Sequence, residues 1–124
     1  MTEIYLAYSH RGGTSMAAWD WVARPLNVLV AYPFVPSYRA LLARAPHVAP
    51  ARTILDSGAF SVWRSGESID IQALTAETLR PEWSESVVLD VIGSAEGSRN
   101  NADYMRAAGS PAWPVFHVGE PWEL

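Results

Sequence analysis

The 124-residue chain contains no cysteine, which excludes a disulfide framework and a thiolate-bound zinc site. Lysine is also absent: all nine basic residues are arginine, which we attribute to a GC-rich coding bias. No apolar run approaches the roughly 18 to 20 residues that span a bilayer. The start, Met1-Thr2-Glu3, carries an acid where a signal peptide carries basic residues. We therefore expect a soluble, cytoplasmic protein without a membrane partner.

An excess of basic charge is lacking as well. The formal net charge is −4, with five arginines and three acids in residues 1–60 but four arginines and ten acids in residues 61–124. Proteins that hold nucleic acid by themselves usually present a basic face, because phosphate contacts supply most of the non-specific affinity. The charge alone therefore does not indicate a nucleic-acid-binding face.

Apolar residues are plentiful. They make up 49% of the chain, and six Trp, five Tyr and three Phe are enough to build a core. This composition excludes a disordered chain, and the length fits one domain.

Apolar, β-rich runs recur along the chain and predict five strands. They lie at Ile4–Tyr8, Asn27–Tyr32, Arg52–Asp56, Val87–Val91 and Trp113–Val118. The runs are nearly continuous rather than alternating, which is typical of strands buried on both faces of a parallel sheet.

Helical patterns fill the connections. Ser37–Ala45 stops before Pro46, as helices do. Asp70 can cap a helix whose apolar positions follow a helical period, and Asn100 or Asn101 can cap another that ends at Gly109. The segment Ser9–Ser15 carries two glycines but matches no phosphate-loop pattern, so we expect a flexible connection.

Alternation of strand and helix predicts an α/β fold, either a doubly wound parallel sheet or a TIM-type (β/α) barrel. Both place functional groups at the carboxyl ends of strands. A complete barrel takes about 250 residues. We expect residues 1–124 to be one partial domain, about half a barrel with five strands, truncated at its C-terminus. The alternative is a half-barrel completed by a second copy, a homo-oligomer.

Three of the apolar runs finish on groups that can exchange or accept protons. Asp56 precedes Ser57 and Gly58, Asp90 follows Val87-Val88-Leu89, and His117 is followed by Gly119 and Glu120. Because parallel strands end at one edge of a sheet, these groups predict a site at that edge.

The residues around Asp56 resemble a known motif. Asp56-Ser57-Gly58-Ala59-Phe60 is similar to the Asp-Ser-Gly-Gly-aromatic motif of the tRNA-guanine (queuine) transglycosylases. The ordered set over residues 27–124 is more similar to phage and bacterial transglycosylase-like proteins that exchange guanine for 7-deazaguanines in DNA or tRNA. That set comprises Leu55 to Trp63, Gly66 with Ile69-Asp70, Leu89 to Ile92, Asn100 before Met105 with Gly109, and Pro114 to Glu120.

The resemblance implies a barrel enzyme in which a carboxylate attacks the ribose anomeric carbon and expels guanine, after which a modified base attacks in turn. It implies proton transfer by Asp56, hydrogen bonding of the guanine edge by Asp90 and stacking on the base by Phe60. Further base contacts are implied for Ser57, Gly58, His117, Gly119 and Glu120. Neither a cofactor nor a resident metal is expected.

Two departures from the family affect the expected activity. Nothing in this chain matches the family's nucleophilic aspartate, and the cysteine-rich zinc site of the tRNA enzymes has no counterpart. The expected partners are guanine or a 7-deazaguanine, together with tRNA or DNA. Exchange then requires missing sequence or a partner chain.

Each candidate residue also has a structural interpretation. Asp56 can be a turn or capping acid, Asp90 can pair with Arg99, and His117 can be a core histidine. Phe60 and Trp63 would otherwise be core residues. Two other functions remain open: a metal-dependent barrel hydrolase using Asp56, Asp90, His117 and Glu120, and a non-catalytic protein that binds a base or a subunit.

Overall fold

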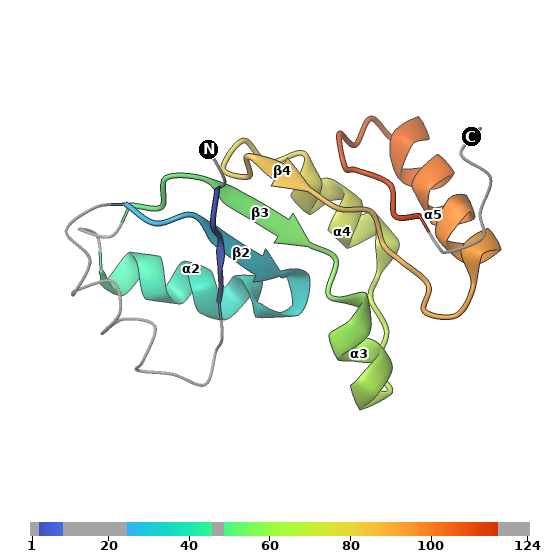
Figure 1. The fold of residues 1–124 in the computed structure, drawn as a ribbon, viewed down its shortest axis with the longest axis horizontal. Coiled ribbons are helices and arrows are strands. Elements are labelled where there is room, and N and C mark those ends of the chain that lie inside the picture. The colour runs from blue at the N-terminus through green and yellow to red at the C-terminus, as the bar shows by residue number, and fades with distance from the viewer. Residues whose placement is uncertain (1–2, 9–24, 46–48, 117–124) are drawn as a thin grey trace.

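A four-stranded parallel sheet forms the centre of the computed structural model, which describes residues 3–8, 25–45 and 49–116 (Figure 1). The strands are β1 (Leu6–Ala7), β2 (Val28–Ala31), β3 (Thr53–Asp56) and β4 (Glu85–Ser86). A 3₁₀ helix η1 (Tyr32–Phe34) precedes α2 (Val35–Arg44), followed by α3 (Ala59–Ser65), α4 (Ile71–Thr78) and α5 (Ala95–Ala107). The predicted α/β class with a parallel sheet is confirmed.

The strands lie in the order β1-β2-β3-β4, so each is adjacent to its neighbour in sequence. Right-handed crossovers that all step in the same direction place their helices on one face of the sheet. A doubly wound sheet instead reverses its strand order once and carries helices on both faces. The described strands show no such reversal.

The core lies on one face of the sheet. Buried side chains alternate along β2 and β3, and the inward residues Val28, Val30 and Leu55 are at most 2% exposed. They form one cluster with residues from the helices: Val35, Tyr38, Leu74 and Met105, together with Trp83 and Val88. The prediction that strands are buried on both faces is wrong here, because their alternate residues are only half-buried.

The strand predicted at Val87–Val91 is not formed: β4 is the two-residue strand Glu85–Ser86, which ends directly before it. Only Val87 continues the ladder, donating from its N–H to the Leu55 carbonyl at 3.0 Å. Side chains of α5 form hydrogen bonds with the backbone groups that follow. The Leu89 carbonyl accepts from Asn101 at 3.1 Å, and the Val91 N–H donates to Ser98 at 2.8 Å. These contacts draw the chain toward α5 and away from the sheet.

The predicted fifth strand is reduced, within the described residues, to a single parallel bridge between Val87 and Trp113. The Trp113 N–H donates to the Ser86 carbonyl at 2.8 Å, and the Val88 N–H donates to the Trp113 carbonyl at 2.9 Å. The five strands expected from the sequence are therefore four strands and one bridge. The bridge places the segment around Trp113 next to the end of β4, so this segment continues the consecutive strand order.

Two of the predicted helix starts differ from the structure. Helix α2 begins at Val35 rather than Ser37, because proline is tolerated in a first turn, where its missing N–H has no partner to lose. Helix α5 is capped by Ser94 rather than by Asn100 or Asn101: the Ser94 hydroxyl accepts from the Gly97 N–H at 2.9 Å. The sequence pattern missed this cap because the first turn of α5 contains a glycine and few apolar residues.

The predicted cap of α4 is confirmed. The Asp70 carboxylate accepts from the Gln72 N–H at 2.9 Å and from the Ala73 N–H at 3.5 Å. Helix α3 was not predicted as a separate helix. None of the helices in the described part of the chain is both long and apolar enough to cross a membrane.

An ionic network joins α2 to α4. Arg39 pairs with Glu77 of α4 and with Glu82 in the following loop. Glu77 also accepts from the indole N–H of Trp83 at 2.9 Å. Burial lowers the pKa of Arg39, but the hydrogen bonds to both glutamates outweigh it and raise the pKa above its ordinary value. The network fixes the two helices that cover β2 and β3.

Candidate functional site

The carboxyl end of β3 is a tight turn built around Asp56. The Asp56 carboxylate accepts from the Gly58 N–H at 3.0 Å, and the Ser57 hydroxyl accepts from the Ala59 N–H at 3.4 Å. Ser57 is 3% exposed, whereas Asp56 is only half-buried. Asp56 is thus a turn acid, as its structural interpretation required. The turn also fixes the direction of its carboxylate at the strand end.

Asp56 lies on the face of the sheet opposite the core. Its strand partner is Ala31, and the register beyond Leu55 and Ser86 sets Val87 beside it. Val87 in turn bridges to Trp113. Partners in adjacent strands point to the same face, so Ala31, Asp56, Val87 and Trp113 form one row across it. Neighbouring strands are about 4.8 Å apart, which separates the Asp56 and Trp113 backbones by about 10 Å.

Trp113 is a candidate residue that the sequence patterns did not single out. It is 63% exposed and stands two strands from Asp56 in that row. In the sequence, Trp113 was noted only as the first residue of the predicted strand Trp113–Val118. Its relation to Asp56 depends on the register, which no local pattern specifies.

Asp90 lies four residues beyond the end of β4 and is held by α5. One of its carboxylate oxygens accepts from the Ser98 hydroxyl at 2.6 Å. Ser98 is 2% exposed and also accepts from the Val91 N–H at 2.8 Å, so one buried hydroxyl fixes both the side chain and the following backbone. The sequence suggested an arginine partner, Arg99; the hydrogen bond to Asp90 comes from the neighbouring Ser98, which no sequence pattern indicated.

Phe60 is exposed rather than part of the core. It is 59% exposed on α3, and its ring centroid lies 5.9 Å from that of Trp63, which is 60% exposed. The structural interpretation of these two aromatics as core residues is therefore wrong. Phe60 lies four residues after Asp56. An exposed ring and a carboxylate are therefore close together in sequence at the end of β3.

Tyr32 follows directly after β2, at the same edge of the sheet. Burial raises the pKa of the Tyr32 hydroxyl, and the negative charges of Glu77 and Asp70 raise it further. Tyr32 therefore keeps its proton across the neutral range and remains able to donate a hydrogen bond.

The remaining predicted contacts, His117, Gly119 and Glu120, lie outside the described residues. Within the described ranges, no group of three or more His, Asp or Glu side chains converges as metal ligands.

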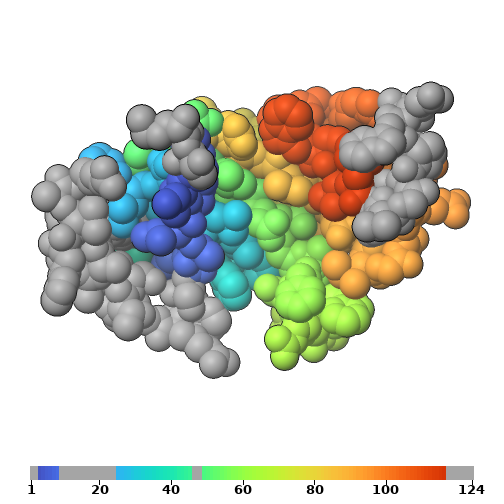
Figure 2. All heavy atoms as spheres, viewed as in Figure 1, coloured from blue at the N-terminus to red at the C-terminus, as the bar shows by residue number. Residues whose placement is uncertain are grey.

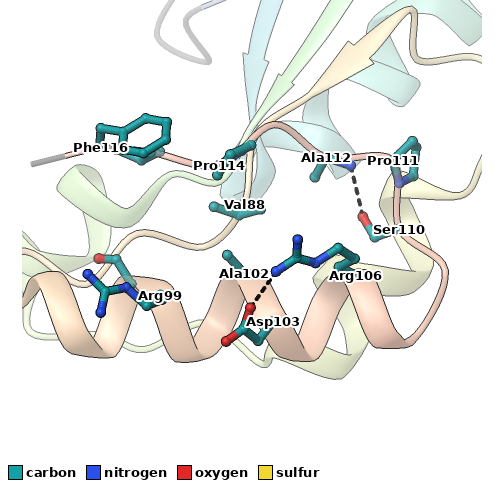
Figure 3. Close-up of a pocket in the computed structure, with 12 residues that line it drawn as sticks. Val88, Arg99, Ala102, Asp103, Arg106, Ser110, Pro111, Ala112, Pro114 and Phe116 are labelled. Atoms are coloured by element: carbon teal, nitrogen blue, oxygen red, sulfur yellow. Dashed lines mark hydrogen bonds and ion pairs between the residues drawn. The ribbon is translucent and has the colours of Figure 1, made fainter. Parts of the chain in front are cut away.

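A separate cavity lies between α5 and the segment after it (Figure 3). Its volume is about 400 Å³. Val88 and Ala102 point into the space between helix and segment, while Arg99, Asp103 and Arg106 stand along α5. Arg106 pairs with Asp103 at 2.5 Å. The cavity includes Ser98 but neither Asp56 nor Asp90, so it is distinct from the predicted site and touches it only through that serine.

Comparison with known proteins gave no match: no family model, no curated protein and no solved structure is similar to this chain.

Proposed function

We propose that this chain binds guanine or a 7-deazaguanine at the carboxyl ends of β3 and β4 and takes part in exchanging that base in tRNA or DNA. Asp90 accepts the two adjacent N–H donors of the guanine Watson-Crick edge, which a carboxylate suits because it offers two acceptor oxygens. Asp56 transfers the proton, and Phe60 stacks on the base. Ser57 and Gly58 contact the base through the turn.

One observation carries this proposal: Asp56 at the end of β3 and Asp90 in the segment that follows β4 are each oriented by a hydrogen bond from their own surroundings. The Gly58 N–H orients Asp56, and the Ser98 hydroxyl orients Asp90. Pre-oriented acceptors recognise a planar base better than mobile ones, because less side-chain freedom is lost on binding. Phe60 and Trp113 are both exposed; Phe60 lies on the helix that follows β3, and Trp113 bridges to Val87.

The proposal includes the architecture. The consecutive strand order and the single covered face support a section of a TIM-type barrel, in which the face that carries Asp56 lines the interior. The attacking carboxylate is then supplied by further sequence or by a partner chain.

Base exchange is tested by following labelled guanine into tRNA and into single-stranded DNA, with this chain joined to the sequence or partner chain that supplies the attacking carboxylate, and with the Asp56→Asn variant of the same assembly. We expect incorporation that depends on Asp56, because asparagine cannot accept and return the proton. Guanine binding without any incorporation would favour a base-binding accessory. Turnover that requires a divalent ion would favour the hydrolase and contradict the proposal.

A further inference from the structure

Helix α3 presents two aromatic rings to the outside. Phe60 and Trp63 lie one helical turn apart, with ring planes inclined by 34° and centroids 5.9 Å apart. Each is about 60% exposed. Large aromatic side chains are usually buried, so a pair of them on a seven-residue helix is an unusual surface feature. Because the two rings are inclined rather than stacked face to face, they offer two adjacent aromatic faces.

A cation lies beside the rings. The guanidinium carbon of Arg64 is 6.0 Å from the centroid of Phe60, within the range of a cation-π contact. Among the described residues, Arg64 forms no ion pair with a carboxylate. Its charge is therefore available to an anion that approaches the aromatic pair.

The position of α3 links this surface to the proposed base site. The helix begins three residues after Asp56, and its side chains project as a separate green lobe in Figure 2. Figure 1 shows the helix extending beyond the end of β3. The buried backbone of Gly58, packed against the ring of Pro33, holds the start of the helix in place.

We propose that α3 binds a single-stranded segment of nucleic acid, in which Trp63 stacks on the base beside the exchanged nucleotide and Arg64 pairs with a phosphate. The assignment of that nucleotide rests on the proposed function. Aromatic rings with a neighbouring cation are the usual means of binding single strands, because every base has a π face and every linkage a negative charge. In this arrangement Phe60 supports Trp63 from the side.

The size of the surface favours a nucleotide over a protein partner. A helix of seven residues is about 10 Å long, and the neighbouring exposed residues Ser61 and Ser65 are polar. A stable protein interface buries about 800 Å² on each partner. Two rings and one cation cover much less than that, but they match a single nucleotide.

The test measures the anisotropy of a labelled short oligonucleotide, as single-stranded RNA, as single-stranded DNA and as a duplex, with the full chain. Trp63→Leu keeps apolar volume but removes the stacking face, and we expect it to weaken single-strand binding by about fivefold to 100-fold. Trp63→Phe should retain most of the affinity. Affinity should fall less steeply with salt in Arg64→Gln. The negative slope of log affinity against log salt should become smaller in magnitude by about 0.7, the contribution of one phosphate on a single strand.

Two matched controls use exposed side chains on other helices. Tyr104→Ala removes an exposed ring from α5, and Arg44→Ala removes an exposed cation from the last turn of α2. Neither should change single-strand affinity by more than about twofold. A comparable loss in these controls would show that binding is not located on α3 and would overturn the proposal.

Guanine binding, measured separately with the wild-type chain and with Asp90→Asn, distinguishes the two proposals. If guanine binds but Trp63→Leu and Arg64→Gln leave oligonucleotide affinity unchanged, the α3 proposal is wrong and the base site stands. If guanine does not bind but the two variants weaken oligonucleotide binding, α3 stands as a single-strand surface and the base-exchange proposal fails. Dissociation of a wild-type oligomer by Trp63→Leu, without an effect on oligonucleotides, would identify a self-contact and also refute the α3 proposal.

Discussion

The backbone of Gly58 lies against the ring of Pro33, so that a Cβ on residue 58 would come within 2.4 Å of the Pro33 Cδ. Pro33 belongs to η1, directly after β2, and Gly58 follows β3. The contact therefore joins the ends of two adjacent strands beside Asp56. Gly58 also has a positive φ of 76°, a region that side chains disfavour.

Gly58→Ala should destabilise the fold by about 2 to 4 kcal/mol, since backbone strain and a steric clash with the Pro33 ring add together. Gly66→Ala is the matched control. Gly66 has the same φ of 76°, but nothing lies within 4 Å of its added Cβ, so only about 1 kcal/mol of strain is expected. Urea denaturation measures both. Equal losses in the two variants would mean that the contact with Pro33 is unimportant.

Ser98→Ala should cost about 1 to 3 kcal/mol, because it removes the hydroxyl that Asp90 and the Val91 N–H share in a buried site. Ser61→Ala, on the exposed face of α3, should change stability by less than about 0.5 kcal/mol. Denaturant unfolding provides the comparison. We also expect weaker guanine binding by Ser98→Ala, since Asp90 loses the group that orients it. Unchanged stability and unchanged guanine affinity would contradict the positioning role.

Asp70→Ala should destabilise α4 by about 1 kcal/mol through loss of its N-cap. Asp70→Ser should restore most of the loss, because a serine hydroxyl can accept the same backbone hydrogen bonds. Thermal unfolding of the three chains measures the effect. If serine were no better than alanine, the carboxylate would act in some way other than capping.

Stability should fall at high pH because of Tyr38. Burial raises the pKa of Tyr38 from 10.0 to about 12, and the charge of Glu82 contributes. Between these two values the unfolded chain has lost a proton that the folded chain retains, so the free energy of unfolding decreases as pH rises. The full contribution, on the order of 2 kcal/mol, is present below about pH 10. Tyr38→Phe should remove this part of the pH dependence; an identical profile in that variant would refute the assignment.

The features predicted correctly depend on local signals. The apolar runs predicted β2 and β3 to within about a residue at either end, and the capping pattern located the start of α4 at Asp70. A strand end followed by Asp56, Ser57 and Gly58 also indicated a turn. In each case the deciding residues are neighbours in sequence.

The features that were missed depend on tertiary contacts. The strand predicted at Val87–Val91 is not formed because Asn101 and Ser98 of α5 take up the backbone that would have continued the ladder. Trp113 shares a face with Asp56 only through register across two strands. Phe60 and Trp63 have the composition of core residues, and only the short projecting helix α3 places them outside.

The central claim, that Asp90 is part of a guanine site, is tested most directly by calorimetric titration of guanine and adenine into wild-type and Asp90→Ala chains. Adenine lacks the adjacent pair of N–H donors that a carboxylate accepts, so it serves as the matched ligand. We predict that guanine binds the wild type more tightly than adenine, and that Asp90→Ala lowers guanine affinity at least about tenfold, since charge-assisted hydrogen bonds contribute about 1.5 to 3 kcal/mol. Equal affinity of the two purines, or guanine affinity unchanged in Asp90→Ala, would contradict the account.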